Sequence, residues 1–198
     1  MSEVLDLPMS SAAPDQAPPR ISEVKLIVPK RHGDERGWFS EIYSARTFSA
    51  LGIDLGFVQV NHSFSASVGT LRGLHLQRPP HGQAKLVRCT RGRIFDVVVD
   101  VRRGAPTYRE WFGTELSAAN GRQLFIPEGF LHGFLTLEAD TEVIYAVSDF
   151  YAPQCEDGVR WDDPALAIDW PLPPGVVPSL SAKDKVQPFF AHFESPFM

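Results

Sequence analysis

The sequence has 198 residues, 43% of them hydrophobic, and a formal net charge of −5, so it fits one domain with a substantial buried core. The negative balance gives no general basic surface, and we therefore expect neither nucleic acid nor membrane as a partner. Its two cysteines, Cys89 and Cys155, have neither metal-site spacing nor the density of a secreted disulfide framework. Without a signal-peptide pattern or an apolar run of about 18 residues, the chain is expected in the cytoplasm.

The N-terminal segment, residues 1–20, is rich in Ser, Ala and Pro and has little apolar pattern, which predicts a disordered tail. A single folded domain is expected over residues 21–198. Here short apolar stretches alternate with Gly, Pro, Asn or Asp, a pattern typical of a β-sandwich or barrel. The expected strands lie, in order, in VKLIVP, GWFSEIY, GFVQVNHSF, AKLVRCTRG, RIFDVVVDVR, REWFGTELS, RQLFIPEG and TEVIYAVSDFY.

Alternation is clearest in IFDVVVDV, where Asp96 and Asp100 share one face of the strand while a phenylalanine and three valines share the other. One helix is expected within SARTFSALGI, with Ser44 as its N-cap and Gly52 at its end. From Gln154 onward the chain is rich in Pro and Asp, which predicts loops or short helices that wrap over the strands. The sequence therefore predicts an all-β fold with short peripheral helices.

Four polar side chains gather in LRGLHLQRPPHGQAKLV (residues 71–87), namely Arg72, His75, Gln77 and Lys85. On a strand, His75 and Gln77 would point to the same side. Each residue also has a purely structural interpretation. A single strand histidine is more often a hydrogen-bonded core residue, and a lysine in an apolar stretch can protect an edge strand from aggregation.

A second histidine, His132, follows the turn that Pro127 and Gly129 make in IPEGFLHGF. The spacing Pro-x-Gly-x-x-His is similar to the second motif of cupin barrels, whose histidine lies inside the barrel. Metal-binding cupins also carry a His-x-His pair and a later Glu in their first motif. Here that stretch reads His75-Leu76-Gln77, and no Glu lies between Gln77 and Lys85. An amide is a weak ligand and an ammonium repels a cation, so we expect no metal, and a metal-dependent cupin oxygenase becomes an unfavoured alternative.

From about Val24 to Pro188 the chain resembles the dTDP-4-dehydrorhamnose 3,5-epimerases, a family of cupin-fold sugar-nucleotide epimerases. The motifs that carry the resemblance are DERGWFSE, FVQVNHSFS, GTLRGLHLQRPP, QAKLV, GRIFDVVVDVRRGAPTY, QLFIPEGFLHGF, VIYAVSDFYAP, WDDPALAIDWP and LSAKD. The resemblance implies a jelly-roll β-barrel, a strand-exchanged homodimer and no cofactor. It also implies conversion of dTDP-4-dehydro-6-deoxy-D-glucose to dTDP-4-dehydro-L-rhamnose. Trp38, Leu131 and the N-terminal tail depart from the family pattern, but none of them is expected to take part in chemistry.

The chemistry of a 4-keto sugar agrees with this resemblance. The C–H bonds at C3 and C5 are both adjacent to the carbonyl, so their inversion needs a base, a group that stabilises the enolate and an acid on the opposite face. A neutral histidine suits the base because its ordinary pKa of about 6.5 lies near the working pH. The resemblance implies the catalytic set, in which His75 is the base and Asp184 its partner, Tyr145 is the acid, and Lys85 and His132 stabilise the enolate. Asp96 is a weaker expectation as the partner of His132.

The resemblance also implies the substrate-binding positions, among which arginine is suited to phosphate because its planar fork can bind two oxygens. Arg36 and Arg72 would contact the diphosphate, Gln59, Asn61 and Glu41 would lie along the nucleotide and sugar, and Phe39 and Tyr151 would pack near the base. The DERGWFSE residues would act from the neighbouring subunit. Taken alone, Arg36 could instead belong to a charged hairpin turn, and Tyr145 could be a core residue.

Two further alternatives stay open. A non-catalytic nucleotide-sugar-binding barrel would keep the arginines but would not need His75, Tyr145 and Asp184 together. Within the enzymes, a 5- or 3-monoepimerase of a related dTDP-4-keto-6-deoxy sugar could share the same base and lysine. The choice between one and two inversions depends on positions that differ by less than about 1 Å, which a sequence does not give.

Overall fold

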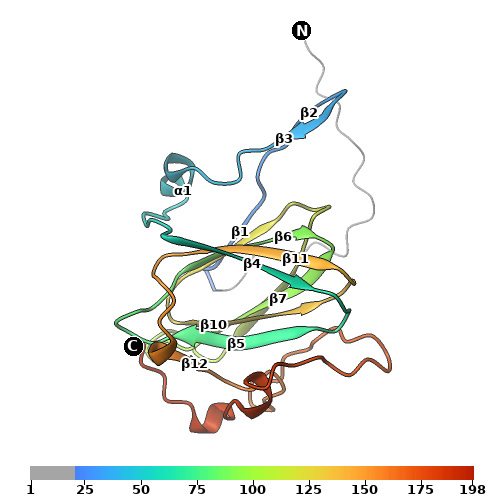
Figure 1. The fold of residues 1–198 in the computed structure, drawn as a ribbon. Coiled ribbons are helices and arrows are strands. Elements are labelled where there is room, and N and C mark those ends of the chain that lie inside the picture. The colour runs from blue at the N-terminus through green and yellow to red at the C-terminus, as the bar shows by residue number, and fades with distance from the viewer. Residues whose placement is uncertain (1–20) are drawn as a thin grey trace.

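The computed structural model describes residues 21–198, and the tail expected over residues 1–20 lies outside the described residues. Two antiparallel five-stranded sheets lie face to face, and a two-stranded hairpin stands beside them (Figure 1). The first sheet has the order β1 (Lys25–Ile27), β9 (Gln123–Ile126), β6 (Lys85–Arg91), β11 (Thr141–Val147) and β4 (Gln59–Ser65). The second has the order β12 (Glu156–Gly158), β5 (Leu71–Gln77), β10 (Phe130–Thr136), β7 (Arg93–Asp100) and β8 (Trp111–Ser117). The hairpin pairs β2 (His32–Asp34) with β3 (Gly37–Phe39).

Helices are short and lie at the periphery. In α1 (Ala45–Ala50), the predicted N-cap Ser44 accepts a hydrogen bond from the Thr47 N–H at 3.4 Å, and Gly52 follows the helix with a φ of 75°. The 3₁₀ segments are η1 (Pro153–Cys155), η2 (Asp184–Val186) and η3 (Phe190–His192). The described chain is thus mostly β-sheet with few helices, as predicted. Within it, no helix has the length and apolar character needed to span a membrane.

All eight predicted stretches contain a strand, although GWFSEIY holds only the three residues of β3. Strands β2, β5, β10 and β12 lie outside these eight stretches, although the placement of His75 and Gln77 on the same side already treats β5 as a strand. β10 is buried along its whole length and therefore lacks the alternation that marks a half-exposed strand. β2 and β12 are three residues each and contain no apolar side chain, so pairing with their neighbours alone defines them.

An apolar cluster fills the space between the two sheets. It includes Val87, Cys89, Ile94, Val98, Leu116, Leu124, Ile126, Phe130, Phe134 and Val143, and we call it the interior cluster. β7 alternates as predicted, because Val97 and Val99 pack on the opposite side of the sheet from Ile94 and Val98. The carboxylate-bearing face of β7 is therefore the interior face. Burial raises the pKa of the Cys89 thiol to about 11, which fits the expected role of a small strand residue.

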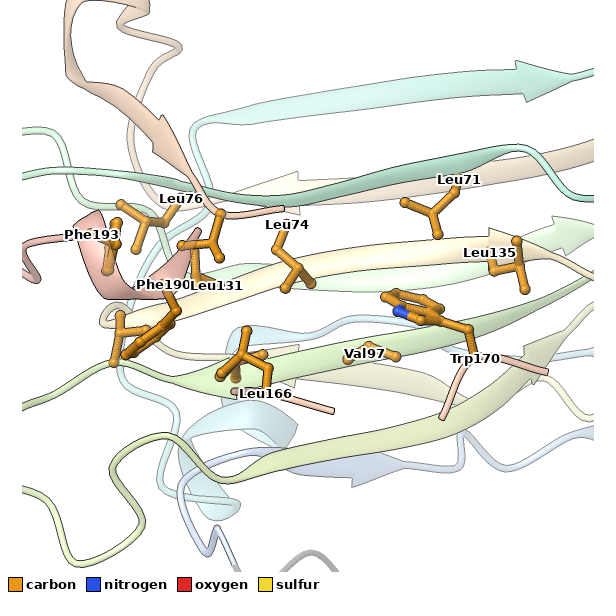
Figure 2. Close-up of a cluster of buried hydrophobic side chains, with 13 residues drawn as sticks. Leu71, Leu74, Leu76, Val97, Leu131, Leu135, Leu166, Trp170, Phe190 and Phe193 are labelled. Carbon is orange, nitrogen blue, oxygen red and sulfur yellow. The ribbon is translucent and has the colours of Figure 1, made fainter. Parts of the chain in front are cut away.

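The outer face of the second sheet is covered by the C-terminal segment, as the sequence predicted (Figure 2). Phe190 and Phe193 pack over one end of the sheet, Leu166 lies nearer its middle, and Trp170 packs toward the other end. Their partners on the strands are Leu71, Leu74 and Leu76 of β5, Val97 of β7, and Leu131 and Leu135 of β10. Because this covering is apolar and closely packed, it fixes the strands whose other face carries the candidate site.

Strands β5 and β10 approach each other unusually closely, and two glycines permit it. A Cβ atom on Gly73 would lie 2.5 Å from Gly133 Cα, and Gly73 has a φ of 136°, which L side chains rarely adopt. A Cβ atom on Gly133 would lie 2.8 Å from the Arg72 carbonyl oxygen. The pairing register of these strands sets His132 opposite His75.

Candidate active site

Polar side chains from both sheets meet next to the interior cluster. Lys85, Asp96 and His132 each lie two positions along the strand from a member of that cluster. Residues two apart on a strand point to the same side, so these three side chains also face inward. Tyr145 packs against the interior cluster from β11. We define the polar cluster as His75, Lys85, Asp96, His132, Tyr145, Glu156 and Asp184.

His75 is oriented by a carboxylate that comes from the C-terminal wrap. Its Nε2 lies 2.5 Å from Oδ1 of Asp184, which is the first residue of η2, and the Ser181 hydroxyl donates to the other oxygen of Asp184 at 2.7 Å. Burial alone would raise the pKa of Asp184, but the hydrogen bonds with His75 and Ser181 lower it below its usual value. An ionised Asp184 accepts a hydrogen bond from Nε2–H, which leaves Nδ1 as the ring nitrogen that is free to act as a base.

His132 has a carboxylate partner of its own. Nε2 of His132 lies 2.8 Å from Oδ1 of Asp96, and Asp96 is completely buried. Burial lowers the pKa of His132, although the charge of Asp96 opposes the shift. His132 is therefore neutral near neutral pH, and the single N–H of its ring is directed at Asp96. The strands β10 and β7 that carry the two residues are direct neighbours in the second sheet.

Lys85 brings the positive charge. It projects from β6 of the first sheet, and its Nζ lies 3.5 Å from the His75 carbonyl oxygen on the second sheet. Burial of the ammonium group lowers the pKa of Lys85 to about 8, while the charges of Asp96 and Glu156 act in the opposite direction. The group thus keeps its proton at neutral pH and begins to lose it in mildly alkaline solution.

Tyr145 occupies the first sheet, across from the strand of His75. Its register partners are Asn61 of β4 and Val87 of β6. Burial raises the pKa of the Tyr145 phenol. The charge of Arg72 acts against this shift, and the charge of Glu156 adds to it. The phenol is therefore protonated at neutral pH and can act as an acid. Arg72 lies near this end of the site and donates to the Phe64 carbonyl oxygen at 3.2 Å.

Tyr151 lies in a loop beside the polar cluster and is held there by hydrogen bonds. Its backbone N–H donates to Oε1 of Gln59 at 3.1 Å, and its hydroxyl donates to Oε2 of Glu156 at 2.9 Å. Gln59 in turn donates to Oδ1 of Asn61 at 2.7 Å on the same strand. The structure thus brings three of the expected substrate-binding residues together at the β4 side of the site.

Three other expected binding residues, Arg36, Phe39 and Glu41, do not reach the polar cluster of their own chain. Arg36 pairs with Asp34 at 2.5 Å within the β2–β3 hairpin, which stands apart from the two sheets in Figure 1. Phe39 is 71% exposed, and Glu41 accepts a hydrogen bond from the Thr47 hydroxyl at 3.0 Å. These residues form an exposed arm.

Two charged residues of the site were missed in the sequence. Glu156 of β12 contacts Tyr151 and forms an ion pair with Lys183, which directly precedes Asp184. Hydrogen bonds from Lys183 and Tyr151 lower the pKa of Glu156 although its burial opposes this. Both residues lie in polar stretches without periodicity, so only the folded chain identifies them. Lys183 does stand inside the LSAKD motif, which is the one signal that could have pointed to it.

Among residues 21–198, no group of three or more His, Cys, Asp and Glu side chains is arranged to hold a metal ion. The side chains that do converge supply an oriented imidazole, an enclosed ammonium and a protonated phenol. Proton transfer at carbon is the chemistry for which such groups are suited, and this places the chain among the all-β acid–base enzymes.

Comparisons with known proteins identify the family. The family model for dTDP-4-dehydrorhamnose 3,5-epimerase matches residues 18–192. The chain is 53% identical over 168 residues to a dTDP-4-dehydrorhamnose 3,5-epimerase from Sinorhizobium fredii, covering 85% of each sequence. It is similar, with a TM-score of 0.86 and 43% identity, to a dTDP-6-deoxy-D-glucose-3,5-epimerase from Legionella pneumophila in complex with dTDP-4-keto-L-rhamnose, covering 91% of this chain and 96% of that one. A 3′-monoepimerase from Streptomyces bikiniensis in complex with dTDP-quinovose gives a TM-score of 0.81 and 37% identity, covering 88% and 87%.

The chain belongs to the dTDP-4-dehydrorhamnose 3,5-epimerase family and is therefore an epimerase of the isomerase class. The resemblance drawn from its motifs is confirmed.

Proposed function

We propose that this chain converts dTDP-4-dehydro-6-deoxy-D-glucose to dTDP-4-dehydro-L-rhamnose by removing and returning a proton at C3 and at C5. The observation that carries the proposal is the placement of His75 and Tyr145 on opposite sheets, with His75 oriented by Asp184 at 2.5 Å. Inversion requires a base on one face of the sugar and an acid on the other, and groups from two facing sheets meet that requirement.

In this mechanism Nδ1 of His75 removes the proton next to the carbonyl. Negative charge then develops on the carbonyl oxygen, where the Lys85 ammonium stabilises it. The one N–H of the neutral His132 ring is already directed at Asp96. The Tyr145 phenol returns a proton to the opposite face. Each inversion begins and ends with one proton bound to carbon and no change in oxidation state, so the reaction itself requires no cofactor and no metal.

The nucleotide end is assigned to the remaining charged and aromatic residues. Arg72 would hold the diphosphate, with Gln59 and Asn61 along the nucleotide and sugar and Tyr151 against the base. Supporting this, Gln59, Asn61 and Tyr151 are linked by hydrogen bonds at one side of the polar cluster. The Legionella pneumophila relative is a complex with dTDP-4-keto-L-rhamnose, which supports the same class of ligand here.

The assembly that we propose is a homodimer of jelly-roll barrels in which the exposed arm of each chain completes the site of the other. Arg36, Phe39 and Glu41 would then act on the partner's substrate. The exposure of Trp38 and Phe39 supports this, as does a groove of about 1120 Å³ that runs between β1 and α1. Residues 21–198 would form the single catalytic domain. The free thiols of Cys89 and Cys155 support a reducing, cytoplasmic setting.

Deuterium incorporation tests the reaction. The wild-type chain, incubated with dTDP-4-keto-6-deoxyglucose in deuterated water, should introduce deuterium at both C3 and C5 and yield the L-configured product. The variant H75A should show neither exchange nor product. Label at only one carbon would identify a monoepimerase, which is the activity named for the Streptomyces bikiniensis relative. Exchange at the wild-type rate in H75A would show that His75 is not the base.

A further inference from the structure

Gln77 is a buried glutamine whose amide is fully used by hydrogen bonds. It is 4% exposed and is the last residue of β5, two positions after His75 on the same face. Its Oε1 accepts from the Ala152 N–H at 2.7 Å, and its Nε2 donates to the His81 carbonyl at 2.7 Å and to the Phe150 carbonyl at 3.2 Å. The orientation of the amide follows from its partners, because the N–H requires the oxygen and both carbonyls require the nitrogen.

These bonds bracket one residue of the candidate site. Phe150 and Ala152 are the two neighbours of Tyr151, so a single side chain binds the peptide groups on both sides of it. Tyr151 is 55% exposed, and core packing therefore does not fix its position. What holds Tyr151 is the pair of bonds to Gln77 together with the bonds to Gln59 and Glu156.

We propose that Gln77 is a positioning residue that presents Tyr151 to the nucleotide end of the substrate. The inference rests on the proposed function, in which Tyr151 packs against the base. Gln77 itself touches neither the sugar nor the reacting atoms. It links the strand of the base His75 to the loop of Tyr151, so that the distance between the proton-transfer end and the nucleotide end of the site is fixed.

Replacement of Gln77 by Glu changes the shape little but removes both donors and turns a carboxylate toward the carbonyl oxygens of His81 and Phe150. The loop should detach, and Tyr151 should lose its fixed position. We expect KM for the dTDP-sugar and the dissociation constant of dTDP, measured by calorimetry, each to rise about 10-fold or more, while kcat changes by less than about 3-fold. A role limited to overall stability would not separate KM from kcat in this way.

Gln83 provides the matched control. Its Nε2 donates one hydrogen bond, at 2.8 Å, to the Asp149 carbonyl, which lies in the same loop but outside the bracket around Tyr151. The variant Q83E should therefore change KM and dTDP affinity by less than about 3-fold. Melting temperatures of both variants report on folding. An unchanged dTDP dissociation constant in folded Q77E, or a lower kcat at unchanged KM, would overturn the proposal.

If Q77E does not fold, the variant Q77N keeps the amide on a stem that is one methylene shorter and takes its place. A double-mutant cycle of Q77N with Y151A then tests the proposal. Q77N should raise the dissociation constant of dTDP when Tyr151 is present, and should have almost no further effect in the Y151A background. Additive losses would mean that Gln77 does not act through Tyr151. Should the wild type bind dTDP but fail to convert the sugar, the proposed reaction falls, while these dTDP measurements still decide the role of Gln77.

Discussion

Burial and the partner of each group together set the charges of the ionisable side chains in the site. Burial lowers the pKa of His132 and brings that of Lys85 to about 8, whereas the bonds to His75 and Ser181 keep Asp184 ionised. A neutral His132, a cationic Lys85 and an anionic Asp184 therefore coexist within one cluster at neutral pH. This division of charge is what the abstraction of a proton next to a carbonyl requires.

The charge of Lys85 should appear in the pH dependence of the reaction. A lysine carries its charge below its pKa, so kcat/KM should fall as the pH rises through about 8. The variant K85R keeps its charge to far higher pH, and its rate, although lower, should lack this alkaline limb. Profiles of kcat/KM over roughly pH 6 to 10 compare the two proteins. A wild-type limb near the ordinary lysine value of about 10.4 would argue against Lys85 as the group that titrates.

Tyr145 separates removal of the proton from inversion. The variant Y145F keeps the ring and loses only the acidic hydroxyl, so its melting temperature should change little. His75 can still remove a proton and return a deuteron to the same face, and deuterium should enter with retained configuration. Net epimerisation should fall by about 10²–10⁴-fold, the range of a general acid. Formation of the L-configured product at the wild-type rate would make Tyr145 a packing residue.

The strands differ in how well their sequences reveal them. β7 is evident from its alternation, and α1 from the cap at Ser44, because both signals are local. β10 carries no such signal since both of its faces are buried, and β12 is defined only by its pairing with β5. The structure placed His75 next to Asp184, a pairing that the family resemblance implied and that no local pattern of the chain could have given.

The close pairing of β5 and β10 depends on Gly73 and Gly133, which let the two backbones approach. In G133A the new Cβ would lie 2.8 Å from the Arg72 carbonyl oxygen, and rigid backbone would have to move. We expect the free energy of unfolding to drop by about 1–3 kcal/mol and the pairing of His75 with His132 to shift, which would lower kcat as well. Gly56 is the control, because a Cβ there meets open space. Equal denaturation midpoints for G133A and G56A would contradict the assigned close approach.

The expected site is incomplete within one chain, because the residues of the exposed arm do not reach the polar cluster. Arg36, Phe39 and Glu41 come from one motif of the sequence, yet their own fold directs them away from the polar cluster. Sequence motifs identify such residues but do not say which copy of the chain they serve. Only the arrangement of elements in space raises the question of a second subunit.

Mixed dimers answer that question. If the chain forms the homodimer proposed above, co-expression of H75A and R36A with different tags allows a mixed dimer to be purified. If Arg36 acts in the partner's site, one site of this dimer carries both substitutions and the other carries neither. At low substrate concentration the mixed dimer should then recover about half of the wild-type activity, since one of its two sites is intact. If Arg36 acts within its own chain, every site carries one substitution and no activity returns. A mixed dimer no more active than its parents, or a fully active monomer by light scattering, would refute the exchange of arms.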